Sequence, residues 1–126
     1  MTENELSKIV LDVAFDMHKT LGPGLFESVY ESVMEYELVN TFNLSVKKQV
    51  VLPVIWKDKK LESGFRIDLI VENKLIIELK SVESLADVHY KQLLTYLKLT
   101  NIKLELLINF NEALLKNGIK RIVNNL

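Results

Sequence analysis

The chain contains no cysteine, which excludes disulfide bonds and any metal site built from thiolates. No uninterrupted apolar run reaches the length that a helix needs to cross a membrane. The N-terminal stretch is acidic and does not resemble a secretory signal, which would begin with basic residues followed by an apolar segment. These absences predict a soluble, cytoplasmic protein with no membrane partner.

Proline is nearly absent, with only Pro23 and Pro53, and the chain carries no internal repeat, low-complexity segment or linker. At 126 residues the chain is long enough for one hydrophobic core. Its 48% of hydrophobic and 26% of charged residues are ordinary for a globular protein. We therefore expect a single domain that spans residues 1–126.

An excess of either charge is also lacking, since 16 Lys and Arg face 17 Asp and Glu and leave a net charge of −1. That balance does not indicate nucleic-acid binding, but a local basic patch matters more than the total. One candidate patch consists of Lys47, Lys48, Lys57, Lys59 and Lys60. The alternative is a strand edge that lysines protect from pairing with other chains. Trp56 beside this patch suits stacking on a base, although a lone tryptophan more often packs inside a protein.

Hydrophobic periodicity and turn residues together predict the order of the elements. Helical spacing of apolar residues predicts helices over 3–20, 25–39 and 85–100, with a short helical turn over 111–116. β-branched and apolar runs predict strands over 46–56, 61–71, 75–80, 103–109 and 119–123. Strands joined by turns, then a helix and a returning strand, indicate an α/β fold with helices packed on a sheet.

Two charged residues interrupt an otherwise apolar strand. Glu78 and Lys80 lie in the run of residues 75–80, which is typical of a buried strand. Residues two apart in a strand project to the same face, so Glu78 and Lys80 project together. Asp68 on the preceding strand is positioned to join them. Two carboxylates and a lysine on one half-buried surface suit a hard divalent cation and an anionic substrate.

The length of the loop between these two strands decides whether the carboxylates meet. A three-residue loop at 72–74 pairs Val71 with Leu75 and brings Asp68 opposite Glu78. A two-residue loop would place Glu78 on the opposite face of the sheet. Carboxylates that face one another without a cation repel and lose hydration, which favours a bound positive charge.

Several short motifs together resemble a known group of enzymes. Asp68, followed by Glu78-x-Lys80 at the end of a hairpin, resembles the signature of the PD-(D/E)XK nucleases, with Ile67 in place of the usual proline. Gln92-Leu93-Leu94-Thr95-Tyr96 is similar to the QxxxY element of RecB-type nucleases. The stretch from Gly24 to Tyr30 matches GxxExxY, the string that names a family of short bacterial proteins within that superfamily.

This resemblance implies a restriction-endonuclease-like α-β-β-β-α-β core, in which helices flank a mixed sheet. It implies a Mg²⁺- or Mn²⁺-dependent nuclease that hydrolyses phosphodiester bonds, with DNA favoured and RNA left open. Asp68 and Glu78 are the expected metal ligands, with the Leu79 carbonyl as a further oxygen. Lys80 is expected to stabilise the phosphate or orient the attacking water. Gln92 is expected to be buried on its helix and to orient the lysine, a water or the phosphate.

Three further residues have competing interpretations. Glu27 is either another metal ligand or simply an acidic residue stabilised by the dipole of its helix. Tyr30, one turn later, either hydrogen-bonds the site or fills the core. Tyr96 follows Gln92 by one turn, with the same two options.

Two alternatives to a nuclease are left open. One is a catalytically silent module that keeps the fold and binds nucleic acid or protein. The other is a structural protein in which Asp68, Glu78 and Lys80 form an internal salt-bridge network. Self-association as a homodimer is a further possibility, because many nucleases of this fold cut duplexes as dimers.

Overall fold

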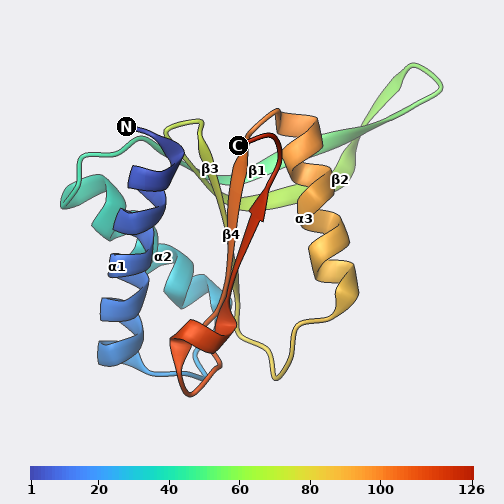
Figure 1. The fold of residues 1–126 in the computed structure, drawn as a ribbon. Coiled ribbons are helices and arrows are strands. Elements are labelled where there is room, and N and C mark those ends of the chain that lie inside the picture. The colour runs from blue at the N-terminus through green and yellow to red at the C-terminus, as the bar shows by residue number, and fades with distance from the viewer.

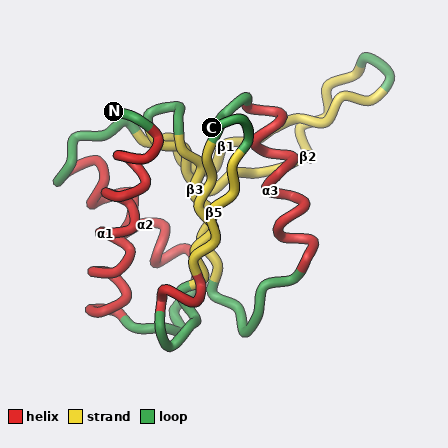
Figure 2. The backbone as a smooth tube through the Cα atoms, viewed as in Figure 1, coloured by secondary structure: helices red, strands yellow, loops and turns green.

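The computed structural model describes residues 1–61 and 64–126, which build one sheet with helices on both of its faces (Figures 1 and 2). The helices are α1 (Glu3–Leu21), α2 (Glu27–Asn40) and α3 (Asp87–Thr100). The strands are β1 (Val46–Trp56), β2 (Lys59–Val71), β3 (Leu75–Lys80), β4 (Leu104–Asn109) and β5 (Ile119–Val123), and a short 3₁₀ helix, η1 (Leu115–Gly118), precedes β5.

The sheet is mixed and keeps the strands in chain order, β1-β2-β3-β4-β5. Only β3 and β4 are parallel, because α3 crosses over between them, while the other neighbouring pairs are antiparallel. This arrangement confirms the predicted α-β-β-β-α-β order and the mixed sheet flanked by helices.

Several element boundaries differ from the sequence-based prediction by one or more residues. α2 begins at Glu27 rather than at residue 25, because Phe26 has an extended backbone and precedes the first helical turn. β2 begins at Lys59, because the hairpin turn contains only Lys57 and Asp58, both with a positive φ. The helical turn expected over 111–116 is instead η1, which begins at Leu115.

The sheet separates two hydrophobic cores. Figure 1 shows α1 and α2 on one face and α3 on the other. Alternate residues of the central strands enter the two cores: Ile77 and Leu106 face α1 and α2, whereas Ile76 and Leu107 face α3. Central strands covered on both faces require nearly continuous apolar sequence, which makes a carboxylate in β3 or β4 exceptional.

Tyr30 fixes the loop that joins α1 to α2. Its ring is fully buried and stacks on Phe110, with the ring centroids 4.3 Å apart. Its hydroxyl donates to the Gly22 carbonyl at 2.6 Å and accepts from the Leu25 amide at 3.2 Å. Tyr30 is thus a core residue that also ties down the loop leading to Glu27, and its hydroxyl does not bond Asp68 or Glu78.

Replacing Tyr30 with phenylalanine should lower the free energy of unfolding by about 1–2 kcal/mol, because the Gly22 carbonyl and the Leu25 amide lose their partner. Chemical denaturation measures this change. Tyr36→Phe is the matched control, since Tyr36 is 63% exposed and should change stability by less than about 0.5 kcal/mol. Equal effects of the two substitutions would contradict the role given to the Tyr30 hydroxyl.

Candidate functional site

The hairpin between β2 and β3 has the register that a shared carboxylate site requires. Val71 pairs with Leu75, so the loop has three residues, and pairing continues to Leu69 and Ile77. Asp68 and Glu78 are the next residues in this register. The prediction of a three-residue loop that brings the two carboxylates together is therefore confirmed.

The two carboxylates each accept a hydrogen bond from the backbone of the opposite strand. The Asp68 Oδ2 atom accepts from the Leu79 amide at 2.9 Å. The Glu78 Oε1 atom accepts from the Asp68 amide at 3.3 Å. At this end of the hairpin, hydrogen bonds to side chains thus replace the backbone hydrogen bonds between β2 and β3. The two carboxyl groups lie next to one another.

Glu78 is buried beside other carboxylates, and this environment opposes its ionisation. Its side chain is only 4% exposed. Burial raises the pKa of Glu78 to about 10, and the nearby carboxylates of Asp68 and Glu105 contribute in the same direction. Without a cation, Glu78 is therefore protonated at neutral pH.

A carboxyl group on β4 completes this buried cluster, and sequence reasoning missed it. Glu105 is fully buried, and neither of its oxygens has a hydrogen-bond partner within the described part of the chain. It pairs with Ile76 and so shares the α3 face of the sheet. Burial raises the pKa of Glu105 to about 9, with a further contribution from Asp68. The sequence feature that could have identified Glu105 is the same one that identified Glu78, a charged residue inside an apolar strand.

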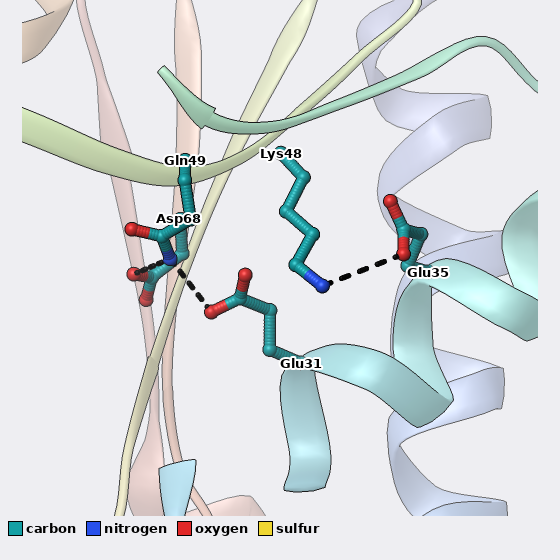
Figure 3. Close-up of polar contacts among 5 residues, drawn as sticks. All are labelled: Glu31, Glu35, Lys48, Gln49 and Asp68. Atoms are coloured by element: carbon teal, nitrogen blue, oxygen red, sulfur yellow. Dashed lines mark hydrogen bonds and ion pairs between the residues drawn. The ribbon is translucent and has the colours of Figure 1, made fainter. Parts of the chain in front are cut away.

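A second flank of the site comes from α2 and β1, as Figure 3 shows. The Gln49 side-chain amide donates to Glu31 at 2.8 Å and to Asp68 at 3.4 Å. Glu31 is 7% exposed, and burial together with the Asp68 charge raises its pKa, opposed by the Gln49 bond. Gln49 has a φ of 53°, so β1 is locally distorted at the residue that bridges Glu31 and Asp68.

Sequence reasoning also missed Glu31 and Gln49. Glu31 lies four residues after Glu27 and three before the buried Met34, so helical spacing alone places it on the inner face of α2. Gln49 carries no comparable signal, because its role depends on the bend of β1 and on the approach of α2.

Lys80 lies at the end of β3, partly exposed, on the strand face that Glu78 shares. The ion pairs within the described residues are Lys8–Asp12 and Lys48–Glu35, the latter at 3.8 Å and visible in Figure 3. Neither of them includes Lys80, Asp68 or Glu78. An internal salt-bridge network is therefore not what holds these three residues together.

Glu27 lies beyond the end of β3 and is not bonded to Asp68 or Glu78. Its carboxylate accepts from the Ser81 amide at 3.1 Å. Glu27, Ser81 and Asn111 line a cleft of about 530 Å³. The adjacent backbone is held by Asn109, whose side chain makes two hydrogen bonds to Val82, at 3.1 and 2.9 Å. The GxxExxY segment thus borders a polar cleft one residue beyond Lys80.

The two motif residues on α3 behave differently. Tyr96 is buried, and its hydroxyl donates to the Arg66 carbonyl at 3.2 Å. Burial and the carboxylates of Glu78, Glu105 and Asp68 raise the pKa of Tyr96 to about 12. Gln92, in contrast, is exposed, so the expectation that it is buried is wrong. The inward stripe of α3 consists of Leu93, Tyr96 and Leu97.

The donor chemistry of the cluster suits a hard divalent cation, since its ligating atoms are carboxylate oxygens. Among the side chains that the structure describes, no three of His, Asp and Glu are arranged to hold a metal ion. Asp68 and Glu78 each direct one carboxylate oxygen at a backbone amide, that of Leu79 and that of Asp68 respectively.

Comparisons with known proteins agree with this picture. The family model described as the PD-(D/E)XK nuclease superfamily matches residues 4–122. The crystal structure of SSO0001 is similar at 26% sequence identity, with a TM-score of 0.55 over 79% of this chain. The chain spans about half of that structure, 51% of its length. The comparison with curated proteins gave no match. Within the described residues, no helix combines the length and the apolar character needed to span a bilayer.

Because the folded-state pKa values of Glu78 and Glu105 lie above those of the unfolded chain, the folded protein holds protons that the unfolded chain releases. We therefore expect the contribution of these two groups to the stability of the protein without metal to be greatest below about pH 4.5. This contribution should be lost as the pH rises through about 9 to 10. Each retained proton contributes up to about 1.4 kcal/mol per pH unit. Thermal melts in EDTA across this range measure the slope.

Glu105→Gln removes one of the two titrating groups and should flatten this slope, leaving the variant more stable than wild type at pH 9. Glu83→Gln is the control, because Glu83 is exposed and the substitution should keep the wild-type slope. If Glu105→Gln has the same slope as wild type, Glu105 is ionised in the folded protein.

Proposed function

Because the chain belongs to the PD-(D/E)XK nuclease superfamily, we propose that it is a divalent-metal-dependent nuclease that hydrolyses phosphodiester bonds at Asp68, Glu78 and Lys80. DNA is the favoured substrate and Mg²⁺ or Mn²⁺ the favoured ion. The observation that supports this proposal most directly is the burial of Glu78 against Asp68, with the pKa of Glu78 at about 10.

Two arguments connect that observation to a metal. If both were ionised, the carboxylates of Asp68 and Glu78 would repel one another and lose hydration, and no cationic side chain in the described residues pairs with them. A divalent cation would remove that repulsion and replace the proton on Glu78. Oxygen ligands favour Mg²⁺ or Mn²⁺ over Zn²⁺, which is bound mainly through nitrogen and sulfur.

A metal ion bound there supplies Lewis-acid charge at the phosphate and lowers the pKa of an attacking water. Asp68 and Glu78 would hold it, with the Leu79 carbonyl as a further donor. Lys80 projects from the face that carries Glu78, and its ammonium group would stabilise the negative charge that develops on the phosphorus oxygens. Leu69 and Leu79 pack in the core, so the hairpin presents these polar groups from a rigid base.

Four other residues are proposed to support the site. Glu27 borders the cleft next to Lys80 and would serve as a further ligand or hold a metal-bound water. Tyr30 maintains the loop that carries Glu27. Tyr96 borders the carboxylates, whereas the exposed Gln92 is free to contact a bound phosphate.

The alternative function is a catalytically silent module that retains the fold and binds nucleic acid or protein. The hydrogen bonds that Asp68 and Glu78 accept from backbone amides, which give both side chains a structural role, favour this alternative. We further propose that the chain is a single domain of the GxxExxY family, related to the RecB-like enzymes. We also propose that it is located in the cytoplasm and forms a homodimer.

Asp68→Asn should abolish both metal-dependent stabilisation and cleavage, because the amide retains an acceptor for the Leu79 N–H group but removes the ligand charge. Its metal-free stability should equal or exceed that of wild type, because the half-buried charge of Asp68, which no cationic side chain in the described residues compensates, is gone. Thermal melts with EDTA, Mg²⁺ or Mn²⁺, followed by incubation with single- and double-stranded DNA and RNA, measure both properties.

Lys80→Met should lower the cleavage rate by roughly 100-fold or more while metal still raises the melting temperature, because Lys80 is not a ligand. Lys103→Met, on an exposed lysine, is the control and should cleave as wild type does. Metal-dependent stabilisation without cleavage in the wild type would favour the silent module. A wild type that metal does not stabilise, together with a destabilised Asp68→Asn, would make the cluster structural.

Metal binding at pH 7.5 should release about one proton per ion, because Glu78 must ionise before it can serve as a ligand. Isothermal titration calorimetry in two buffers that differ in ionisation enthalpy measures the released protons. The affinity should also rise with pH up to about 10, the pKa of Glu78. Heats that are independent of the buffer would show that the ion binds without displacing that proton.

A further inference from the structure

The distal part of the β1–β2 hairpin, residues 54–61, extends away from the sheet and is called the arm here. Figures 1 and 2 show it projecting beyond the helices, on the opposite side of the molecule from α1. Pairing between its strands continues to the tip, where Trp56 faces Lys59 across the two-residue turn. The arm is therefore a two-stranded ribbon with no further layer packed against it.

On this exposed ribbon, apolar residues at the end of β1 face lysines at the start of β2. Ile55 is 64% exposed and Trp56 is 63% exposed, so the packing alternative for Trp56 is wrong. The Lys57 ammonium lies 5.7 Å from the centre of the Trp56 ring. The three lysines at positions 57, 59 and 60 and the single acidic Asp58 leave the tip, residues 55–61, with a charge of +2 in a chain whose net charge is −1.

The pairing of the arm places a cation on both of its faces. Trp56 is directly opposite Lys59, and Ile55 is directly opposite Lys60. Directly opposed residues project to the same face, and neighbouring positions project to opposite faces. Each face of the ribbon therefore carries one lysine beside one apolar side chain. A ribbon that docked on a protein would be expected to have one apolar and one polar face.

We propose that the arm inserts into the major groove of duplex DNA, with Lys59 and Lys60 contacting the phosphates on the two walls of the groove. The major groove of B-form DNA is wide enough for a two-stranded ribbon, and its walls are lined with phosphates on both sides. The deep, narrow major groove of A-form RNA does not admit such an element. This inference rests on the proposed function and specifies double-stranded DNA as the substrate.

The arm and the carboxylates lie on one continuous strand, which sets their separation. Eight residues of β2 separate Lys60 from Asp68, or about 26 Å at the rise of an extended strand. That distance corresponds to roughly eight base pairs of B-form DNA. The arm would therefore hold the duplex nearly one helical turn from the bond that is cut.

The double variant Lys59→Ala/Lys60→Ala tests this proposal. Its matched control is Lys19→Ala/Lys116→Ala, which removes the same charge from exposed positions at the end of α1 and in η1. Fluorescence anisotropy with a 30-base-pair DNA duplex in EDTA, at several salt concentrations, measures affinity without cleavage. The arm variant should bind DNA about tenfold more weakly than wild type. The slope of log K against log salt concentration should become less negative by about 2, and the control should match wild type.

Trp56 provides a direct second measurement, because it is the only tryptophan of the chain. DNA should quench or shift its emission in the wild type, and a duplex of RNA with the same sequence should change it much less. Equal responses to DNA and RNA duplexes would overturn insertion into the major groove.

The outcomes separate this inference from the proposed function. If the wild type cleaves DNA and the arm variant binds like the control, the arm has no role in binding and the nuclease assignment survives. If the wild type neither binds nor cleaves nucleic acid, both proposals fail. If light scattering shows a wild-type dimer and a monomeric arm variant, the arm is a contact between two copies of the chain, which overturns its assignment to DNA.

Discussion

The burial of Glu78 beside Asp68 is the interaction on which the rest of the site depends. Hydrogen bonds from backbone amides to the two carboxyl groups across the hairpin, together with a proton on Glu78, reduce the cost of burying this pair. The same arrangement leaves the pair short of positive charge. A group that burial keeps neutral regains its charge when a cation arrives, so the low-dielectric environment that opposes ionisation of the metal-free protein also favours a bound ion.

The sheet explains why such a costly cluster persists. β3 and β4 are covered on both faces, and their apolar residues pack into two cores. Glu78 and Glu105 lie on these central strands, where packing restricts the backbone and the side chains cannot reach bulk water. The parallel crossover through α3 brings Glu105 next to Glu78, while α2 brings Glu31 to the opposite flank. The stability of the surrounding core offsets the repulsion within the cluster.

β2 connects the buried carboxylate site to the exposed arm. At one end, Asp68 lies among buried groups, and at the other end the strand continues into the exposed arm. Tertiary packing ends where the arm leaves the sheet, and only pairing between two strands continues. A rigid site and a projecting basic ribbon on one strand suit a protein that must hold a long polyanion while acting on one of its bonds.

The sequence by itself determined the order of the elements, the three-residue hairpin loop and the meeting of Asp68 with Glu78. These features follow from local periodicity and from the two-residue repeat of a strand, which act over a few neighbouring residues. Only the tertiary structure decided that Glu31, Gln49 and Glu105 border the same carboxylates and that Gln92 is exposed. Those outcomes depend on the rotation of α3 about its axis, the bend of β1 at Gln49 and the pairing of β3 with β4, and each of these is set by packing between segments far apart in the chain.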